Sequence, residues 1–106
     1  MKTTEALAAL TALSQETRLA AYRRLVAAGP EGLTAGRLGK AVKAAPATLS
    51  FHLKALGNAG LVSARQEGRY VRYFASITAM TALVDYLTAH CCGGNPAACK
   101  PTWSPP

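Results

Sequence analysis

The sequence predicts a mainly helical α+β fold, with about five helices and one two-stranded β-hairpin. Apolar residues recur every three or four positions through most of the chain, which is the period of an amphipathic helix. From Leu61 to Ala75 this period is lost, and Gly68 lies inside that stretch, where a tight turn needs a positive φ. With 106 residues, the chain is expected to form one small domain that gains stability from a partner subunit.

Capping residues place the first two helices. Thr3 or Thr4 is expected to cap a short helix that ends at Ala12, since a side-chain hydroxyl accepts a hydrogen bond from a free amide of the first turn. Ser14 is expected to cap a second helix over Gln15–Ala28 in the same way. The apolar stripe of this second helix would contain Leu19, Tyr22, Leu25 and Val26.

Similar signals place the remaining elements. Thr34 is expected to cap a third helix over residues 35–42, and Pro46 occupies the first position of a fourth helix that ends at Asn58. The hairpin strands are expected to join at residues 67–68, and a last helix would cover residues 78–90. Residues 1–90 would therefore form the folded domain, and residues 91–106 a tail rich in Cys and Pro.

The basic residues are unevenly distributed. The chain carries 12 Lys and Arg against 5 Asp and Glu, and between Arg37 and Arg72 the only acid is Glu67. Such a cluster favours double-stranded DNA as a partner, because each contact with a phosphate releases condensed counterions. A solvated face that only adds solubility is the alternative. No apolar run is long enough for a bilayer and no secretory signal is visible, which indicates a cytoplasmic protein without a membrane partner.

Three segments, Leu13–Leu25, Ala45–Val62 and Arg65–Ala75, resemble the ArsR/SmtB family of repressors. The most specific part is the pattern S-x-H-L-x-x-L-x-x-x-G-L-V, which is complete between Leu49 and Val62. The resemblance implies a winged helix-turn-helix fold and a homodimeric transcriptional repressor. Such a protein would bind an operator containing an inverted repeat and would release it when a metal or metalloid binds.

Within this resemblance, the fourth helix is the recognition helix. Its leucines would be buried, which would turn the opposite face toward the major groove. Arg69, just past the hairpin turn, would contact the flanking backbone or minor groove. The expected DNA contacts are Lys43, Thr48, Ser50, Phe51, His52, Lys54, Arg65 and Arg69.

Two of these residues have a second interpretation. His52 lies at the edge of the buried face, where a histidine with a structural partner is the alternative to a DNA contact. Phe51 stands where the family frequently has a polar or basic residue, and it is expected either to meet a thymine methyl group or simply to pack. The dimer interface is expected on the first and last helices, at Leu7, Leu10, Leu83, Tyr86 and Leu87.

All three cysteines, Cys91, Cys92 and Cys99, lie near the end of the chain. Thiolates prefer soft ions, and an adjacent pair suits a three-coordinate pyramidal centre better than tetrahedral zinc, whose ligands are usually spaced C-x₂₋₄-C. His90 keeps a zinc site with three cysteines and one histidine open. The resemblance extends to arsenic-responsive repressors with a vicinal cysteine pair and a third tail cysteine, which implies trivalent arsenic or antimony as the effector and no permanent cofactor.

Two other functions and an enzyme are the alternatives to this interpretation. In a thiol redox or persulfide switch, the negative end of the last helix would disfavour the thiolate, and a disulfide between Cys91 and Cys92 would be strained. A metalloid-buffering protein that does not bind DNA would leave the basic cluster unexplained. An enzyme is not expected, since His90 beside Cys91 has no nearby acid to orient it except Asp85.

Overall fold

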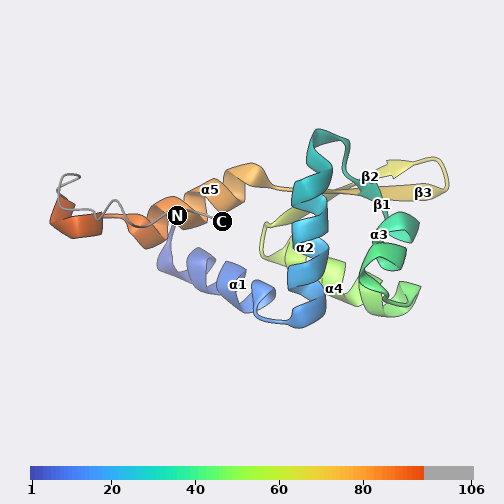
Figure 1. The fold of residues 1–106 in the computed structure, drawn as a ribbon, viewed down its shortest axis with the longest axis horizontal. Helices are drawn as coiled ribbons and strands as arrows, with labels where there is room; N and C mark the ends of the chain where they lie inside the picture. Colours follow the sequence, from blue (N-terminus) through green and yellow to red (C-terminus); the bar gives the residue numbers. More distant parts are fainter. Residues whose placement is uncertain (95–106) are drawn as a thin grey trace.

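The computed structural model describes residues 1–94, and it confirms the mainly helical fold with a β-hairpin wing. Within this part of the chain there are five α-helices and a three-stranded antiparallel sheet (Figure 1). The elements are α1 (Thr3–Leu13), α2 (Glu16–Ala28), a 3₁₀ turn η1 (Gly29–Glu31), β1 (Leu33–Thr34), α3 (Ala35–Val42), α4 (Pro46–Asn58), β2 (Val62–Glu67), β3 (Tyr70–Ala75), α5 (Ile77–Thr88) and a 3₁₀ turn η2 (Cys91–Gly94).

The hydrophobic core lies where α2, α3 and α4 meet, and buried alanines of α1 and Leu83 of α5 are part of it. Burial of these apolar side chains is the main stabilising term, and full burial of one leucine contributes about 1.5–3 kcal/mol. Every third or fourth residue of α4 faces inward, as the period of its leucines predicts. The fully buried large side chains are Leu25, Leu38, Leu49, Leu56 and Leu61.

The sheet has the order β1-β3-β2, and its short first strand was not predicted from the sequence. In β1, Leu33 pairs with Tyr73 of β3, which closes the hairpin wing onto the helical part of the domain. Gly32 makes this approach possible. Its φ is +62°, and a Cβ at this position would collide with the Tyr73 carbonyl oxygen and lie 2.7 Å from Cδ1 of Phe74.

The helix starts differ from the prediction at the first two helices. The N-cap of α1 is Lys2, whose backbone N–H donates to the Glu5 carboxylate at 2.7 Å, and both Thr3 and Thr4 lie within the helix. The N-cap of α2 is Gln15, whose side-chain oxygen accepts from the backbone N–H of Arg18 at 2.9 Å. Ser14 instead ends α1, because its hydroxyl donates to the Thr11 carbonyl.

The buried face of α2 is also narrower than predicted. Ala21, Tyr22 and Leu25 are buried, whereas Leu19 and Val26 are 45% and 42% exposed. The α3 and α4 bounds follow the prediction, with Thr34 accepting from the backbone N–H of Arg37 and Pro46 opening α4. The hairpin turn lies one residue later than expected, at residues 68–69, because Glu67 still pairs with Tyr70.

The helices α1 and α5 extend together from one end of the molecule, opposite the hairpin (Figure 1). The hydroxyls of Thr3 and Tyr86 are 2.6 Å apart and join the two helices. No helix among residues 1–94 is long and apolar enough to cross a membrane.

Candidate DNA-binding surface and thiol site

The outer face of α4 carries the residues expected to contact DNA. Leu49, Leu53 and Leu56 are buried, which fixes the rotation of the helix. Because about 100° separates successive residues, the opposite face must point to solvent. The exposed residues of that face are Ala47, Thr48, Ser50, Phe51 and Lys54, as predicted.

A groove beside α4 brings a second group of polar residues to the same surface. It is lined by α3, α4 and β3 and has a volume of about 680 Å³. Lys40 and Lys43 of the α3 end lie along it together with Ser50. Lys43 occupies a left-handed conformation (φ 57°, ψ 45°) at the C-cap of α3, and this turn sets the direction in which α4 begins. Lys40 was not among the contacts predicted from the sequence.

His52 has a partner inside the protein. Its Nδ1 lies 3.1 Å from Nη1 of Arg18, and the Nε of the same arginine donates to the Ala12 carbonyl at 2.7 Å. His52 is only half-buried, so its ring lies between the core and the exposed face. The structural interpretation of this histidine is therefore the one that the geometry supports, and Arg18 is the partner that the sequence analysis missed.

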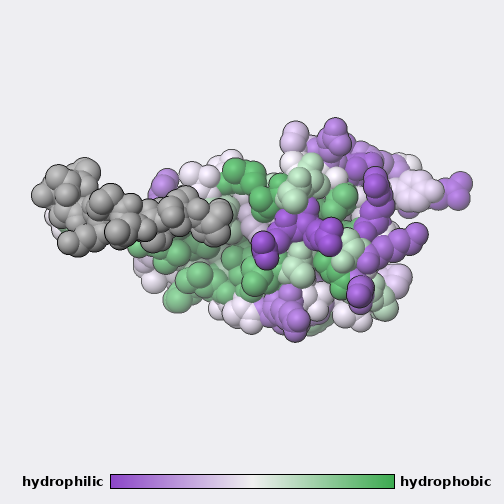
Figure 2. Space-filling view, in the orientation of Figure 1, coloured by the Kyte–Doolittle hydropathy of each residue, from purple (hydrophilic) through white to green (hydrophobic). Residues whose placement is uncertain are grey.

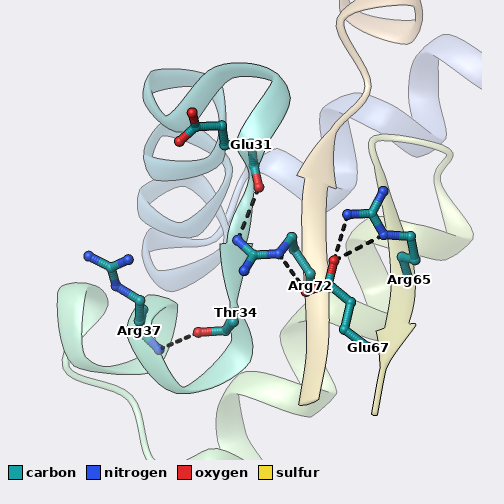
Figure 3. A network of polar contacts seen from close by, with 6 residues as sticks. All are labelled: Glu31, Thr34, Arg37, Arg65, Glu67 and Arg72. Atoms are coloured by element: carbon teal, nitrogen blue, oxygen red, sulfur yellow. Dashed lines mark hydrogen bonds and ion pairs between the residues drawn. The ribbon is translucent and has the colours of Figure 1, made fainter. Parts of the chain in front are cut away.

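The wing carries an ion-pair network centred on Glu67 (Figure 3). One carboxylate oxygen accepts from Nε of Arg72 at 2.8 Å, and the other accepts from Nε of Arg65 at 3.1 Å. Arg72 also donates to the backbone carbonyl of Glu31 at 3.1 Å, and the Arg65 guanidinium lies 5.0 Å from the centre of the Phe74 ring. The hydrogen bonds from Arg72 and then Arg65 hold the pKa of Glu67 below its ordinary value.

This network changes the role that the sequence assigned to Arg65. Its charge is already paired with Glu67, which reduces the charge that Arg65 can offer to a phosphate. Arg69, in contrast, lies in the two-residue hairpin turn and is exposed. Figure 2 shows that hydrophilic side chains gather over the half of the molecule that bears the wing, whereas hydrophobic ones are more frequent over α1.

Four of the five residues expected at the dimer interface are exposed. Leu7 and Leu10 of α1 are 58% and 41% exposed, and Leu87 of α5 is 56% exposed, next to Tyr86 at 36%. Leu83 is only 3% exposed and belongs to the core of the protomer. The expectation for Leu83 was therefore wrong, because its side of α5 packs against the rest of the domain.

Two of the three cysteines lie in η2. The last helix was predicted to reach His90, but α5 ends at Thr88, because Ala89 has a non-helical ψ of 134° and His90 has a φ of 61°. The Sγ atoms of Cys91 and Cys92 are 3.4 Å apart, and Cys92 is disulfide-bonded. Within residues 1–94, no three His, Cys, Asp or Glu side chains gather closely enough to hold a metal ion. Cys99 lies outside the described residues.

Comparisons with known proteins agree with this geometry. A family model described as a helix-turn-helix domain matches residues 13–64. Among curated proteins, YceK of Bacillus subtilis (strain 168), an uncharacterized HTH-type transcriptional regulator, is 41% identical over 58 residues. That match covers 55% of this chain and 57% of YceK, so the chain spans little more than half the length of this relative.

Solved structures extend the similarity to most of the chain. HlyU from Vibrio cholerae N16961 is 30% identical with a TM-score of 0.68, covering 87% of this chain and 99% of HlyU. An ArsR-like transcriptional regulator from Rhodococcus sp. RHA1 is 28% identical with a TM-score of 0.69, covering 79% and 76%. A homodimeric winged helix-turn-helix DNA-binding domain from Mycobacterium bovis, a possible ArsR-family regulator, is 25% identical with a TM-score of 0.65, covering 88% and 86%.

The helix with a polar outer face and the β-hairpin beside it define the winged helix-turn-helix class of transcriptional regulators. Both the fold and the helix-turn-helix match place the chain in this class. The chain belongs to the ArsR/HlyU type of these regulators.

Proposed function

We propose that this chain is a transcriptional repressor that binds an operator as a homodimer and releases it when trivalent arsenic or antimony binds the C-terminal cysteines. The observation that carries the DNA-binding part is the outer face of α4, where small polar residues and Lys54 are exposed opposite a buried leucine stripe. A helix of this kind fits the major groove of B-DNA, and hydrogen-bonding side chains can contact base edges there.

Charge supports the same partner. The face that would meet DNA carries Lys40 and Lys43 along the α3–α4 groove and Arg69 at the hairpin turn. These residues come from α3 and the wing, which lie beside α4, so they could contact phosphates next to the major groove while α4 enters it. The formal net charge of +7 adds a long-range attraction to DNA.

The proposed dimer follows from the exposed apolar residues of α1 and α5. Leu7, Leu10 and Leu87 lie on the two helices that extend together from the end opposite the wing. A two-fold axis at this end would place the two α4 helices of the dimer on an inverted repeat, about 34 Å apart. The homodimeric Mycobacterium bovis domain supports this arrangement by its similarity.

The effector part of the proposal depends on sulfur chemistry. The sulfurs of Cys91 and Cys92 are 3.4 Å apart, so once the disulfide at Cys92 is reduced both could bind one ion. An adjacent cysteine pair suits a three-coordinate pyramidal centre better than tetrahedral zinc, whose ligands are usually spaced C-x₂₋₄-C. Trivalent arsenic and antimony form such centres with soft thiolate donors, and Cys99 would supply the third sulfur.

The position of the thiols suggests how binding would reach the DNA. Only two residues separate the end of α5 at Thr88 from Cys91. A metalloid held by η2 and the tail would therefore constrain the end of a helix that the proposed dimer uses. A coupling free energy of about 1–3 kcal/mol between two sites is typical and would weaken operator binding by about 5- to 150-fold.

The experiment is a titration of labelled operator DNA, followed by fluorescence anisotropy, with the protein kept reduced by a phosphine that does not bind arsenic. Arsenite, methylarsenite and antimonite are each expected to release the DNA, and zinc is expected to do so poorly. Replacing Cys91, Cys92 or Cys99 with Ser is expected to leave operator binding intact and to abolish release. Loss of DNA binding in these variants would instead mean that the cysteines are structural.

A peroxide and a polysulfide titration separate the redox alternative. Because η2 is not a continuation of α5, the negative end of the helix dipole is displaced from the thiols, and this argument against a redox switch is weaker than the sequence suggested. Release by peroxide or polysulfide at lower concentration than by arsenite would favour a thiol redox repressor. Arsenite binding without any DNA binding would favour a metalloid buffer.

A further inference from the structure

Phe51 is the most unusual residue of the proposed recognition surface. It is 67% exposed, although a large aromatic ring in water is unfavourable unless a partner covers it. It also lies about 200° around α4 from Leu49 and from Leu53, which are both buried, so it occupies the middle of the outward face. In the proposed complex this position would be the deepest in the major groove.

The Phe51 ring packs against the side chain of the next residue. It makes an edge-to-face contact with His52, with ring centroids 5.4 Å apart and an angle of 70° between the planes. His52 in turn lies 3.1 Å from the Arg18 guanidinium, which is bonded to the end of α1. An aromatic ring held in this way loses less conformational entropy on binding than a free side chain would.

The chemistry of the major groove limits what this ring can contact. The base edges there present hydrogen-bond donors and acceptors, and the one apolar group of the unmodified bases is the C5 methyl of thymine. A phenyl ring cannot satisfy a donor or an acceptor, so against any other base it would leave polar atoms without partners. Phe51 lies between Ser50 and Lys54, which are about one helical turn apart. Both are exposed and suited to neighbouring polar atoms of the bases or to phosphates.

We infer that Phe51 is a specificity-determining residue that selects a thymine in each half-site by covering its methyl group. This inference rests on the proposed DNA-binding function and adds a base preference to it. A second protein is a less suitable partner for this ring, because the exposed apolar residues of α1 and α5 lie elsewhere, and Phe51 is surrounded by residues complementary to DNA.

The test begins with duplexes that the homodimer selects from a random pool. Each thymine of the selected half-site is then replaced by deoxyuridine, which removes only the methyl group. At one position per half-site, this replacement is expected to weaken binding by the wild type about four-fold, or about sixteen-fold when both half-sites are changed. The estimate is the burial of one methyl group, about 0.8 kcal/mol, converted to a ratio of affinities.

Substitutions at Phe51 complete the test. Phe51→Ala is expected to bind the thymine and deoxyuridine duplexes with the same affinity, and Phe51→Leu, which keeps an apolar group, is expected to retain part of the difference. Lys54→Ala is the control, because it should weaken both duplexes equally and keep the four-fold ratio.

The outcomes separate this inference from the proposed function. If the wild type bound selected DNA tightly but was indifferent to every thymine methyl, or if Phe51→Ala kept the four-fold ratio, the inference would be wrong and DNA binding would stand. If the wild type selected no duplex from the pool, both would be wrong.

Discussion

Among single residues, Glu67 controls how much of the wing's positive charge is available. Its carboxylate is bonded to both Arg65 and Arg72, and these bonds lower its pKa from the ordinary value of 4.5. A carboxyl whose pKa is lowered by folding stabilises the folded state above its unfolded pKa, and this contribution is lost as the pH falls through the folded pKa. The network therefore remains charged at neutral pH and is lost only in acid.

Replacing Glu67 with Gln should strengthen DNA binding. The change frees Arg65 and Arg72 for phosphates, and each new phosphate contact makes the dependence of log K on log salt steeper by about 0.9. Anisotropy titrations between 50 and 200 mM salt should show the steeper dependence and tighter binding at the lower salt concentration.

Glu31→Gln is the matched control for this prediction. It changes the net charge by the same amount, but Arg72 contacts only the backbone carbonyl of Glu31, so the network remains. Equal effects of the two substitutions would mean that net charge alone matters. Because Glu67 stays ionised, the ratio of wild-type and Glu67→Gln affinities should be constant from about pH 6 to pH 8.

Single-residue predictions from the sequence succeeded where the helical period alone decides the outcome. The outward face of α4 is an example, because three leucines fix its rotation. They failed where long-range packing decides. Leu83 is buried and Leu19 is exposed because of what other elements cover, and the partner of His52 is 34 positions away in the sequence. None of these three outcomes can be predicted from a local sequence pattern.

Among the secondary-structure elements, α5 depends on how it begins. Ser76 is its N-cap, with its hydroxyl accepting from the backbone N–H of Ala79 at 3.2 Å. The backbone N–H of Ser76 donates to the Leu61 carbonyl at 2.8 Å, which joins the start of α5 to the residue before β2. The cap therefore helps to fix the direction in which α5 leaves the sheet.

Replacing Ser76 with Ala should lower the free energy of unfolding by about 1 kcal/mol, because one amide of the first turn loses its acceptor. Urea denaturation at a fixed protein concentration measures this change, since the stability of a dimer depends on concentration. Ser63→Ala, at an exposed position of β2, is the control and should change stability by less than about 0.5 kcal/mol. An equal loss in both variants would argue against the capping role.

Elements were predicted correctly where a start signal and a local apolar period agree. Thr34 caps the third helix and Pro46 opens the fourth, and the predicted bounds of both helices were correct. The strand β1 has two residues, which is too short for any alternation, and it forms only because β3 lies beside it. The cap of α2 was assigned to Ser14 on propensity, but the side chain of the next residue, Gln15, makes the bond.

For the whole molecule, the distribution of apolar and charged surface matters most. The exposed leucines of α1 and α5 lie at one end, and the wing and α4 carry the polar surface at the other (Figures 1 and 2). Small domains bury a smaller share of their surface than large ones, so association through the apolar end would add stability that one protomer lacks. The chain length and the apolar positions of the first and last helices predicted this division.

Replacing Leu87 with Asp should convert the proposed dimer to a monomer, because the interface would have to bury an unpaired charge. Sedimentation should show half the mass, and operator affinity should fall at least about ten-fold because one protomer contacts one half-site. Leu19→Asp is the matched control. Leu19 is exposed to a similar extent on α2, and this variant should remain dimeric. A dimeric Leu87→Asp variant would place the interface elsewhere.

Arg18 connects α1 and α4 directly within each protomer of the proposed dimer. A single guanidinium group holds the Ala12 carbonyl near the end of α1 and the His52 ring on α4, so these two helices are fastened without an intervening loop. A tilt of α1 at the subunit boundary would therefore be transmitted to α4 as a rotation of that helix. A small change at the subunit boundary would then change the distance between the two α4 helices of the dimer.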